Sequence, residues 1–377
     1  MTKPIRVLEV FHGMDCGGAE NMIMNLYRNI DRTKVQFDFL VHTPNKCFFD
    51  DEILSLGGNI YSVPYYRGIN YRAYSNSVNA FFSGHSEISV VHGHLGSCAN
   101  IYLNIAKKHG CYTIVHSHST KPERSLKNAL YRLNTYHVRR IADYFIGCSD
   151  ASGEYRFGKA IIAQKEKYIT LNNAINTDAF LYNESTRNAI REKYGIGNDW
   201  LIGHVGRFNY PKNHEYLIDV FNHLIKIHPD SKLILVGEGD LREGIAEKVK
   251  KLNMSDNVIF TGLQRNVNEI LQAVDCFVFP SHYEGLPLTV IEAQAASLPC
   301  VISDTITKEV AITDLVKYAS IDSDPQEWTK IIANSIENNI RVSRKAEIVK
   351  AGYDIDATTK WLTELYVNHS NKRLIQS

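Results

Sequence analysis

The 377-residue chain lacks the features that mark several special classes of protein. No apolar run approaches the roughly 18 residues that a membrane-spanning helix needs. The seven cysteines are scattered without a C-x-x-C pair, which disfavours a zinc cage and a disulfide framework and predicts reduced thiols in a cytosol. Neither sign of charge dominates, with 42 basic and 41 acidic residues, so we expect no nucleic-acid partner.

The start of the sequence also lacks the long apolar stretch and cleavage site of a signal peptide, because Met-Thr-Lys-Pro leads directly into a short apolar run. We therefore expect a cytoplasmic protein whose contact with a membrane, if any, is peripheral and on the inner face. A composition of 44% hydrophobic and 22% charged residues is that of a folded globular chain. The length predicts two domains.

Short β-branched runs alternate with longer amphipathic stretches along most of the chain, a pattern typical of parallel α/β sheets. We expect strands at residues 7–11, 37–42, 59–63, 89–92, 112–116, 144–148, 168–171, 200–205, 232–236, 258–261, 276–279 and 300–303. Helices are expected at residues 20–30, 215–227, 241–252 and 267–273. The pattern predicts two Rossmann-like domains joined near residues 195–199, with a ligand in a cleft at the carboxyl ends of the strands.

Two glycines, Gly17 and Gly18, join the first expected strand to the first helix. Glycine is common in any tight strand-to-helix turn. Exposed backbone N–H groups at a helix N-terminus also suit a phosphate. The motif is not G-x-G-x-x-G, and no acid follows the second strand, so a dinucleotide cofactor is disfavoured.

Histidines gather where three of the expected strands end, at His12, His92, His94, His116 and His118. A single such histidine is usually a core or loop residue. Several at one sheet edge can donate to a phosphate or transfer protons. The two His-x-His pairs also raise a metal hydrolase as an alternative, but matching carboxylate ligands are not evident, and we expect no metal.

Two cations, Arg207 and Lys212, follow the first strand of the second half. They could be an ordinary solvated pair. Their place at a strand's carboxyl end favours binding of a leaving diphosphate. Further on, Glu284 lies in a Gly- and Pro-containing loop and Glu292 in the helix after it. The helix dipole would account for Glu292 but not for Glu284.

The eight-residue spacing of Glu284 and Glu292 resembles the E-x7-E signature of retaining GT-B glycosyltransferases of family 4. The Pro-Ser-x-x-Glu-Gly-Leu-Pro segment around Glu284, the Val-Gly-Glu-Gly segment at residues 236–239 and Asn173 occur in the order of that family. Phrases such as Val-His-Ser-His-Ser at residues 115–119 look most like bacterial exopolysaccharide and capsule enzymes. The resemblance covers nearly the whole chain.

This resemblance implies a GT-B fold with an acceptor domain at 1–195, a nucleotide-sugar domain at 196–355, and a closing helix at 356–377 that crosses back to the N-terminal domain. It implies a nucleotide-sugar donor, with uridine favoured as the nucleoside, and no essential metal or other cofactor. The implied catalytic residues are His116, Glu284, Arg207 and Lys212. The implied donor-binding residues are Gly17, Gly18, Gly206, Gly237, Glu238, Leu263, Gly285, Leu286 and Glu292. His118 is an alternative to His116, and Asn173 is placed beside the nucleotide, where Ala174 stands in place of the glycine of many relatives.

The family's reaction is front-face displacement with retention, in which the departing diphosphate is stabilised by Arg207 and Lys212 and itself helps to deprotonate the acceptor. The acceptor is expected to be a saccharide, and a lipid-linked one is favoured. Two alternatives stay open: a sugar-nucleotide 2-epimerase of the same fold, and a non-catalytic nucleotide-sugar-binding subunit.

A basic segment at residues 121–140 is opposed by one acid, Glu123, and is interleaved with apolar residues. A solvated helix face is the ordinary explanation. Its place on the acceptor domain favours an amphipathic helix that touches anionic lipid. The expected membrane contacts are Lys121, Arg124, Lys127, Arg132, Arg139 and Arg140.

Overall fold

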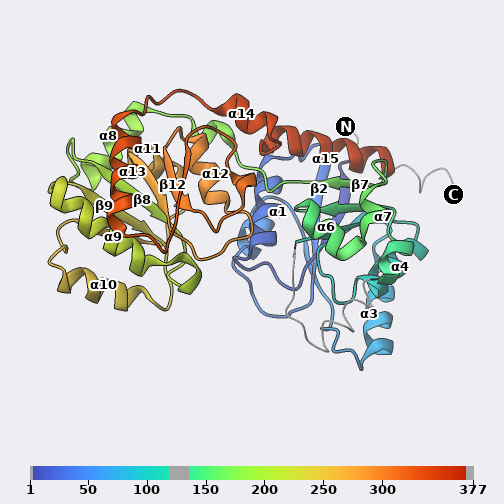
Figure 1. Cartoon of the computed structure of the whole chain (residues 1–377). Helices are drawn as coiled ribbons and strands as arrows, with labels where there is room; N and C mark the ends of the chain where they lie inside the picture. The colour runs from blue at the N-terminus through green and yellow to red at the C-terminus, as the bar shows by residue number, and fades with distance from the viewer. Residues whose placement is uncertain (1–2, 119–135, 371–377) are drawn as a thin grey trace. The chain divides into compact units, whose positions relative to one another are not determined.

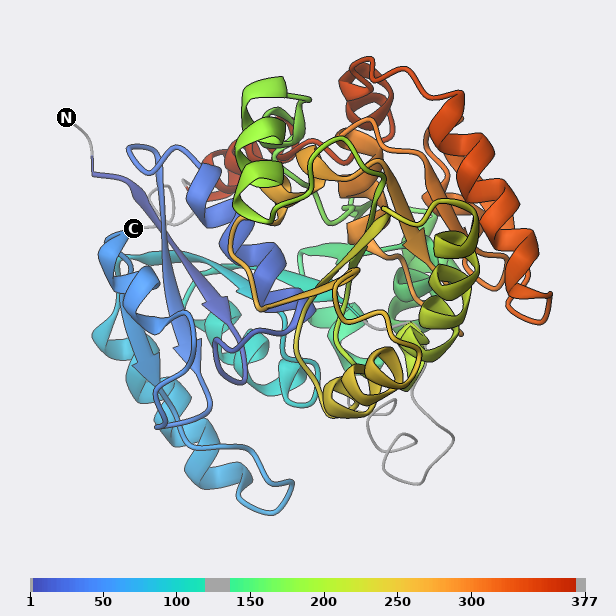
Figure 2. The same ribbon diagram turned by 90° about the vertical axis from the view of Figure 1, so that its left-hand side faces the viewer.

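The computed structural model describes residues 3–118 and 136–370. These residues form two compact units, each built on its own parallel sheet (Figures 1 and 2). Unit 1 comprises Met1–Ala174 and Asp354–Ser377, and unit 2 comprises Ile175–Tyr353. The last segment of the chain thus belongs to the same unit as the first.

The sheet of unit 1 has seven strands in the order β3-β2-β1-β4-β5-β6-β7, and all neighbours are parallel. The strands are β1 (Ile5–Val10), β2 (Val35–Val41), β3 (Ile60–Ser62), β4 (Ile88–Gly93), β5 (Tyr112–Ser117), β6 (Tyr144–Gly147) and β7 (Tyr168–Thr170). The order reverses between β1 and β4, the place where ligands bind in open α/β sheets.

Helices cover both faces of this sheet. They are α1 (Gly18–Asn29), α2 (Asp50–Ser55), α3 (Tyr71–Gly84), α4 (Ala99–Lys108), α6 (Asp150–Phe157), α7 (Lys159–Ile162) and α15 (Ile355–Ser370), and residues 136–141 are also helical. Apolar residues of α1, α2 and α15 share one core with the sheet, and those of α3, α4 and α6 share another. Because strand side chains alternate between faces, Val7 packs into the first core and Leu8 into the second.

Unit 2 repeats this design with six parallel strands in the order β10-β9-β8-β11-β12-β13. The strands are β8 (Leu201–Val205), β9 (Lys232–Val236), β10 (Val258–Gly262), β11 (Cys276–Phe279), β12 (Cys300–Ser303) and β13 (Val316–Ala319). The helices are α8 (Glu184–Lys193), α9 (His214–Ile227), α10 (Arg242–Lys251), α11 (Val267–Ala273), α12 (Leu288–Ala295), α13 (Pro325–Glu337) and α14 (Lys345–Lys350). The 3₁₀ turns are η1 (Thr177–Phe180), η2 (Tyr210–Lys212) and η3 (Lys308–Val310).

All the expected strands are present, with ends that differ by at most two residues. The sequence analysis missed β13, because this half-exposed edge strand has a lysine, Lys317, between its apolar residues. The prediction that the closing helix packs on the N-terminal domain is confirmed. Helix α15 lies against α1 and the strands of unit 1, as Figure 1 shows.

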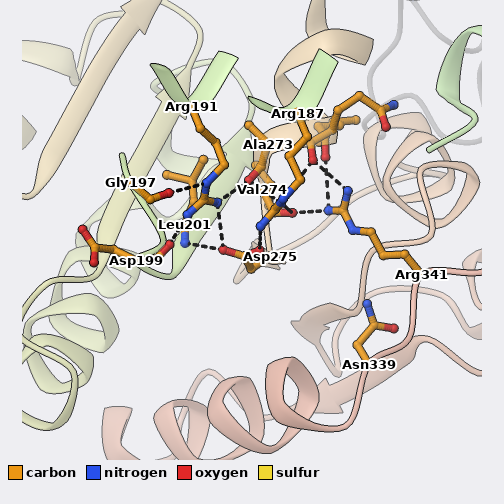
Figure 3. A network of polar contacts seen from close by, with 12 residues as sticks. Arg187, Arg191, Gly197, Asp199, Leu201, Ala273, Val274, Asp275, Asn339 and Arg341 are labelled. Atoms are coloured by element: carbon orange, nitrogen blue, oxygen red, sulfur yellow. Dashed lines mark hydrogen bonds and ion pairs between the residues drawn. The ribbon is translucent and has the colours of Figure 1, made fainter. Parts of the chain in front are cut away.

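The expected domain boundary at residues 195–199 is about twenty residues too late, since the units divide between Ala174 and Ile175. Helix α8, which we expected to belong to the first domain, is bound to unit 2 by its arginines. Arg187 and Arg191 donate to the carboxylate of Asp275 at 2.5 and 3.2 Å (Figure 3). Both also donate to the carbonyl of Ala273 at the end of α11, at 2.8 Å.

Candidate active site

The loop after β8 in unit 2 is shaped by close contact with the loop after β9. Backbone hydrogen bonds join Gly206 N to Val236 O at 2.9 Å and Phe208 N to Glu238 O at 3.0 Å. Gly237 has a φ of +143°, and a Cβ at this position would collide with the carbonyl oxygen of Gly206. The glycine therefore allows the two loops to lie against each other, which explains the Val-Gly-Glu-Gly pattern.

The two predicted cations differ in their surroundings. Lys212, at the end of η2, lies 2.7 Å (Nζ to Oε1) from Glu284 and 4.5 Å above the centre of the Phe279 ring. Arg207 has a side chain that is 67% exposed, and its nearest carboxylate, Asp240, is 3.9 Å away. Lys212 is thus held in place, whereas Arg207 extends into solvent.

The structure brings the two signature glutamates to the same end of the unit 2 sheet. Glu284 lies in the loop between β11 and α12, and Glu292 lies on α12. The N-terminus of α12 has no side-chain cap, so its first backbone N–H groups stay available to an anion. Burial raises the pKa of Glu292 to about 7.

The other predicted donor residues of unit 2 lie on loops at the carboxyl edge of the same sheet. A Cβ on Gly285 would meet no atom within 4 Å, whereas Leu286 packs against the core. Leu263 follows β10 and is 79% exposed. Glu238 lies 3.5 Å from Arg242. Of the predicted glycines of unit 2, Gly206 lies against Lys212, since a Cβ at Gly206 would come within 3.1 Å of the Lys212 side chain.

Two buried histidines under this loop were missed by the sequence analysis. His204 on β8 hydrogen-bonds through Nδ1 to the Val278 carbonyl at 2.9 Å, and His214 stacks on Phe208. Desolvation lowers the pKa of His204 well below its usual value and that of His214 to about 4. Both are neutral at pH 7 and support the loop without adding charge. No local pattern distinguishes them from core residues.

In unit 1, Gly17 caps α1 without a side-chain hydrogen bond, and Gly18 is its first residue. A Cβ on Gly17 would collide with the Glu20 carboxylate, whereas Gly18 is open on all sides. Asn173 precedes Ala174, which is 3% exposed and ends the first segment of unit 1. The buried Oδ1 of Asn173 has no hydrogen-bond partner in the described part of the chain.

Four of the five predicted histidines pack together, whereas His12 is exposed and meets the Tyr65 ring at 5.2 Å instead. His116 is completely buried and stacks on His118 at 4.1 Å between ring centres, and it lies 5.4 Å from His92. Both ring nitrogens of His116 lack a hydrogen-bond partner among the described residues, whereas His118 is partly exposed. The structure therefore brings together the four histidines at the carboxyl ends of β4 and β5, and among these His118 lies nearest to solvent.

A buried carboxylate, missed from the sequence, lies beneath these histidines. Glu9 on β1 is fully buried, and its Oε2 lies 2.8 Å from His94 Nε2 and 3.4 Å from His92 Nδ1. Burial raises the pKa of Glu9 and lowers that of His94 well below its usual value. A lone acid inside an apolar strand carries no motif, so only the fold reveals this neighbour.

Comparison with known proteins identifies the family. The model "Glycosyltransferase Family 4" matches residues 16–178, and "Glycosyl transferases group 1" matches residues 186–354. The Bacillus subtilis protein EpsF, named as a glycosyltransferase, is 35% identical over 371 residues, which cover 96% of each chain. The chain is a family 4 glycosyltransferase.

Two further similarities place this glycosyltransferase more closely. The Staphylococcus aureus capsular polysaccharide biosynthesis glycosyltransferase CapH is 23% identical over 97% of this chain and 99% of its own. Anabaena HepE, solved in complex with UDP, superposes with a TM-score of 0.70 at 16% identity and covers 98% of each chain. The GT-B fold is thereby confirmed, and the glycosyltransferase is of the exopolysaccharide and capsule type.

The expected membrane contacts of this glycosyltransferase are largely beyond the described residues, where Lys121, Arg124, Lys127 and Arg132 lie. Arg140 is exposed. Arg139 is half-buried, packs over the Tyr136 ring at 4.9 Å and donates to the Arg156 carbonyl. None of the described helices is long and apolar enough to cross a bilayer.

One ring nitrogen from each of His92, His94 and His116 lies within 4.8 Å of the others, the spacing of a metal-binding group. Both ring nitrogens of His94, however, already lie 2.8 Å from protein atoms, Glu9 Oε2 and His118 Nε2. Binding a metal through His94 would break one of these contacts. We therefore assign His94 to hydrogen bonding between Glu9 and His118.

Proposed function

We propose that this glycosyltransferase moves a hexosyl or N-acetylhexosaminyl group from a UDP-sugar to a lipid-linked saccharide, with retention of anomeric configuration. Unit 2 binds the donor and unit 1 binds the acceptor. The observation that carries the proposal is the ion pair of Lys212 with Glu284 beside the uncapped start of α12. The UDP complex of HepE supports uridine as the nucleoside.

In the proposed reaction the sugar–oxygen bond to the diphosphate breaks and the acceptor oxygen attacks from the same face. The diphosphate gains negative charge as it leaves, and Arg207 and Lys212 stabilise this charge. Glu292 accepts hydrogen bonds from the ribose hydroxyls. Glu284 holds Lys212 until donor binds and then lies beside the donor sugar. The held cation Lys212 and the exposed cation Arg207 do the work of a metal, so none is essential.

The test has two steps. A thermal-shift screen against sugar nucleotides identifies the donor. We expect UDP-sugars to raise the melting temperature of the protein more than ADP- and GDP-sugars do. Incubation with that donor and a polyprenyl-diphosphate saccharide should give an α-linked product from an α-linked donor, read by NMR coupling constants. Turnover should persist in EDTA. An epimer formed from donor alone, or loss of activity to the chelator, would contradict the proposal.

We also propose that the basic segment at residues 121–140 binds anionic lipid, because a lipid-linked acceptor lies at a membrane surface. Each lysine or arginine near an anionic membrane surface contributes about 1 kcal/mol to the free energy of membrane binding. In liposome flotation the protein should float with phosphatidylglycerol vesicles at low salt and not with phosphatidylcholine vesicles. Flotation indifferent to lipid charge and to salt would contradict this contact.

A further inference from the structure

Three side chains of unit 1 form a continuous hydrogen-bonded chain from the core outward. Glu9 Oε2 lies 2.8 Å from His94 Nε2, and His94 Nδ1 lies 2.8 Å from His118 Nε2. Glu9 is fully buried, His94 is 8% exposed and His118 is partly exposed. The chain therefore has one end in the core and the other at the surface of unit 1.

We propose that Glu9, His94 and His118 form a proton relay, in which His118 contacts the acceptor hydroxyl and passes its proton inward to Glu9. This inference rests on the proposed function and adds a proton acceptor to it. His118 is the catalytic residue of the relay, because it touches the substrate. His94 and Glu9 are positioning residues that act through it.

With Glu9 ionised, the hydrogen-bond partners assign one tautomer to each histidine. An ionised Glu9 accepts from His94 Nε2–H, which leaves a lone pair on His94 Nδ1. That lone pair accepts from His118 Nε2–H, so His118 Nδ1 also carries a lone pair. The acceptor hydroxyl can therefore donate to His118 Nδ1.

Proton transfer along this chain is balanced. As the acceptor oxygen bonds to the sugar carbon and the sugar–diphosphate bond breaks, the hydroxyl proton moves to His118 Nδ1. The Nε2 proton of His118 moves to His94 Nδ1, and the Nε2 proton of His94 moves to Glu9. Both histidines end neutral in the opposite tautomer, Glu9 ends as a neutral acid, and every hydrogen bond is kept.

The surroundings favour a proton on Glu9 over one left on an imidazole. Arg156 on α6 donates to the His116 carbonyl at 2.7 Å, and its positive charge disfavours a histidinium nearby. Desolvation lowers the pKa of His118 to about 3 and raises that of Glu9. His92, His116 and Tyr366 also face the chain, and Tyr366 donates to the other oxygen of Glu9 at 3.3 Å.

Glu9→Gln tests the relay, since glutamine can still accept from His94 but cannot take up the proton. We expect kcat for transfer to fall by about 100-fold with little change in the acceptor KM. The acid limb of the wild-type pH profile, where Glu9 is already protonated, should disappear. His118→Gln should lower kcat by the same factor. The double variant should have a kcat no lower than that of either single variant.

His42→Gln is the matched control. His42 is also buried at the end of a unit 1 strand, and its nitrogens contact the Phe11 carbonyl and the Tyr74 hydroxyl. Any general loss of activity that comes from replacing a buried polar group should appear in His42→Gln, but the pH profile of this variant should stay that of the wild type. An unchanged profile in Glu9→Gln, or additive losses in the double variant, would overturn the relay.

Histidine-selective ¹⁵N labelling of the full chain gives a readout that needs no activity. We expect His94 and His118 to carry protons on Nε2 and to change tautomer together on acidification, and Glu9→Gln should abolish this joint change. Independent titration, or a bound zinc ion on His94, would overturn the relay. A wild-type enzyme that transfers no sugar yet shows the joint change would refute the proposed function alone.

Discussion

Lys212 is neutralised by Glu284 before any donor binds, whereas Arg207 is exposed and loosely paired. A diphosphate approaching Lys212 must compete with a carboxylate, and the developing charge of a leaving group competes better than the ground-state donor. In the proposed mechanism the pair therefore favours the transition state over the bound donor, which is the condition for a faster chemical step.

Replacing either cation should remove this stabilisation and leave the fold intact. We expect Arg207→Ala and Lys212→Ala each to lower kcat by about 10²–10³-fold, the range for removing one charge-stabilising donor. Lys226→Ala, an exposed lysine of α9, is the control and should keep full turnover. Initial rates at saturating donor measure the effect, and full turnover by both single variants would remove these residues from the mechanism.

Glu292 predicts a pH dependence of donor binding. Its raised pKa, about 7, makes it a neutral acid at pH 6 and a carboxylate at pH 8. Ribose hydroxyls donate more strongly to the carboxylate, so affinity for UDP should rise about tenfold from pH 6 to pH 8.

Calorimetric titration of UDP into Glu292→Gln should show an affinity that does not change between pH 6 and pH 8. The exposed Glu327→Gln on α13 should behave as the wild type. A pH slope that persists in Glu292→Gln would assign the titration to another group.

At the level of elements, the site depends on loops that touch each other. Gly237 and Gly239 both have positive φ, and a Cβ on either would collide with backbone of the loop after β8. Gly244 on α10 offers a contrast, because a Cβ there would meet no atom within 4 Å.

Gly237→Ala should therefore separate the two loops, lowering the melting temperature and weakening UDP binding together. Gly244→Ala should leave binding unchanged and stabilise the fold by roughly 0.5–1 kcal/mol, since alanine is the better helix former. Urea unfolding and UDP titration on both variants measure these effects. Wild-type affinity in Gly237→Ala would show that the contact of the loops does not shape the site.

The alternation of apolar runs and amphipathic stretches was enough to predict twelve strands and the fold class, because parallel strands buried on both faces are continuous apolar runs. It failed at β13, whose edge position leaves one side open. It also failed at α8, whose unit is decided by arginine contacts to Ala273 and Asp275 that lie far apart in the sequence.

The same limit applies to the candidate site. Residues in glycine-bearing loops, such as Arg207 and Glu284, were predicted from their place after strands. Glu9 could not be predicted from the sequence, because the residues that it contacts come from other elements that only the folded sheet brings near. The histidines were noticed as a row, and the choice of His118 over His116 needed their exposure.

At the scale of the whole molecule, two units that each have their own cores predict two unfolding steps. UDP should raise only the step that belongs to unit 2, because ligand binding stabilises the unit that holds the site. Asp275→Asn should lower that same step by about 3 kcal/mol, since Arg187 and Arg191 lose their shared carboxylate. Differential scanning calorimetry measures both, and a single step that shifts as a whole would contradict the independence of the units.

The return of α15 to unit 1 has a consequence for synthesis on the ribosome. Domains usually complete folding in the order in which they emerge. Here the first strands keep the part of one apolar face that α15 covers open until the chain end arrives, whereas the inserted unit, Ile175–Tyr353, can finish earlier. A premature stop after Tyr353 would leave a nascent protein with an intact unit 2 and an incomplete unit 1 that chaperones and proteases recognise.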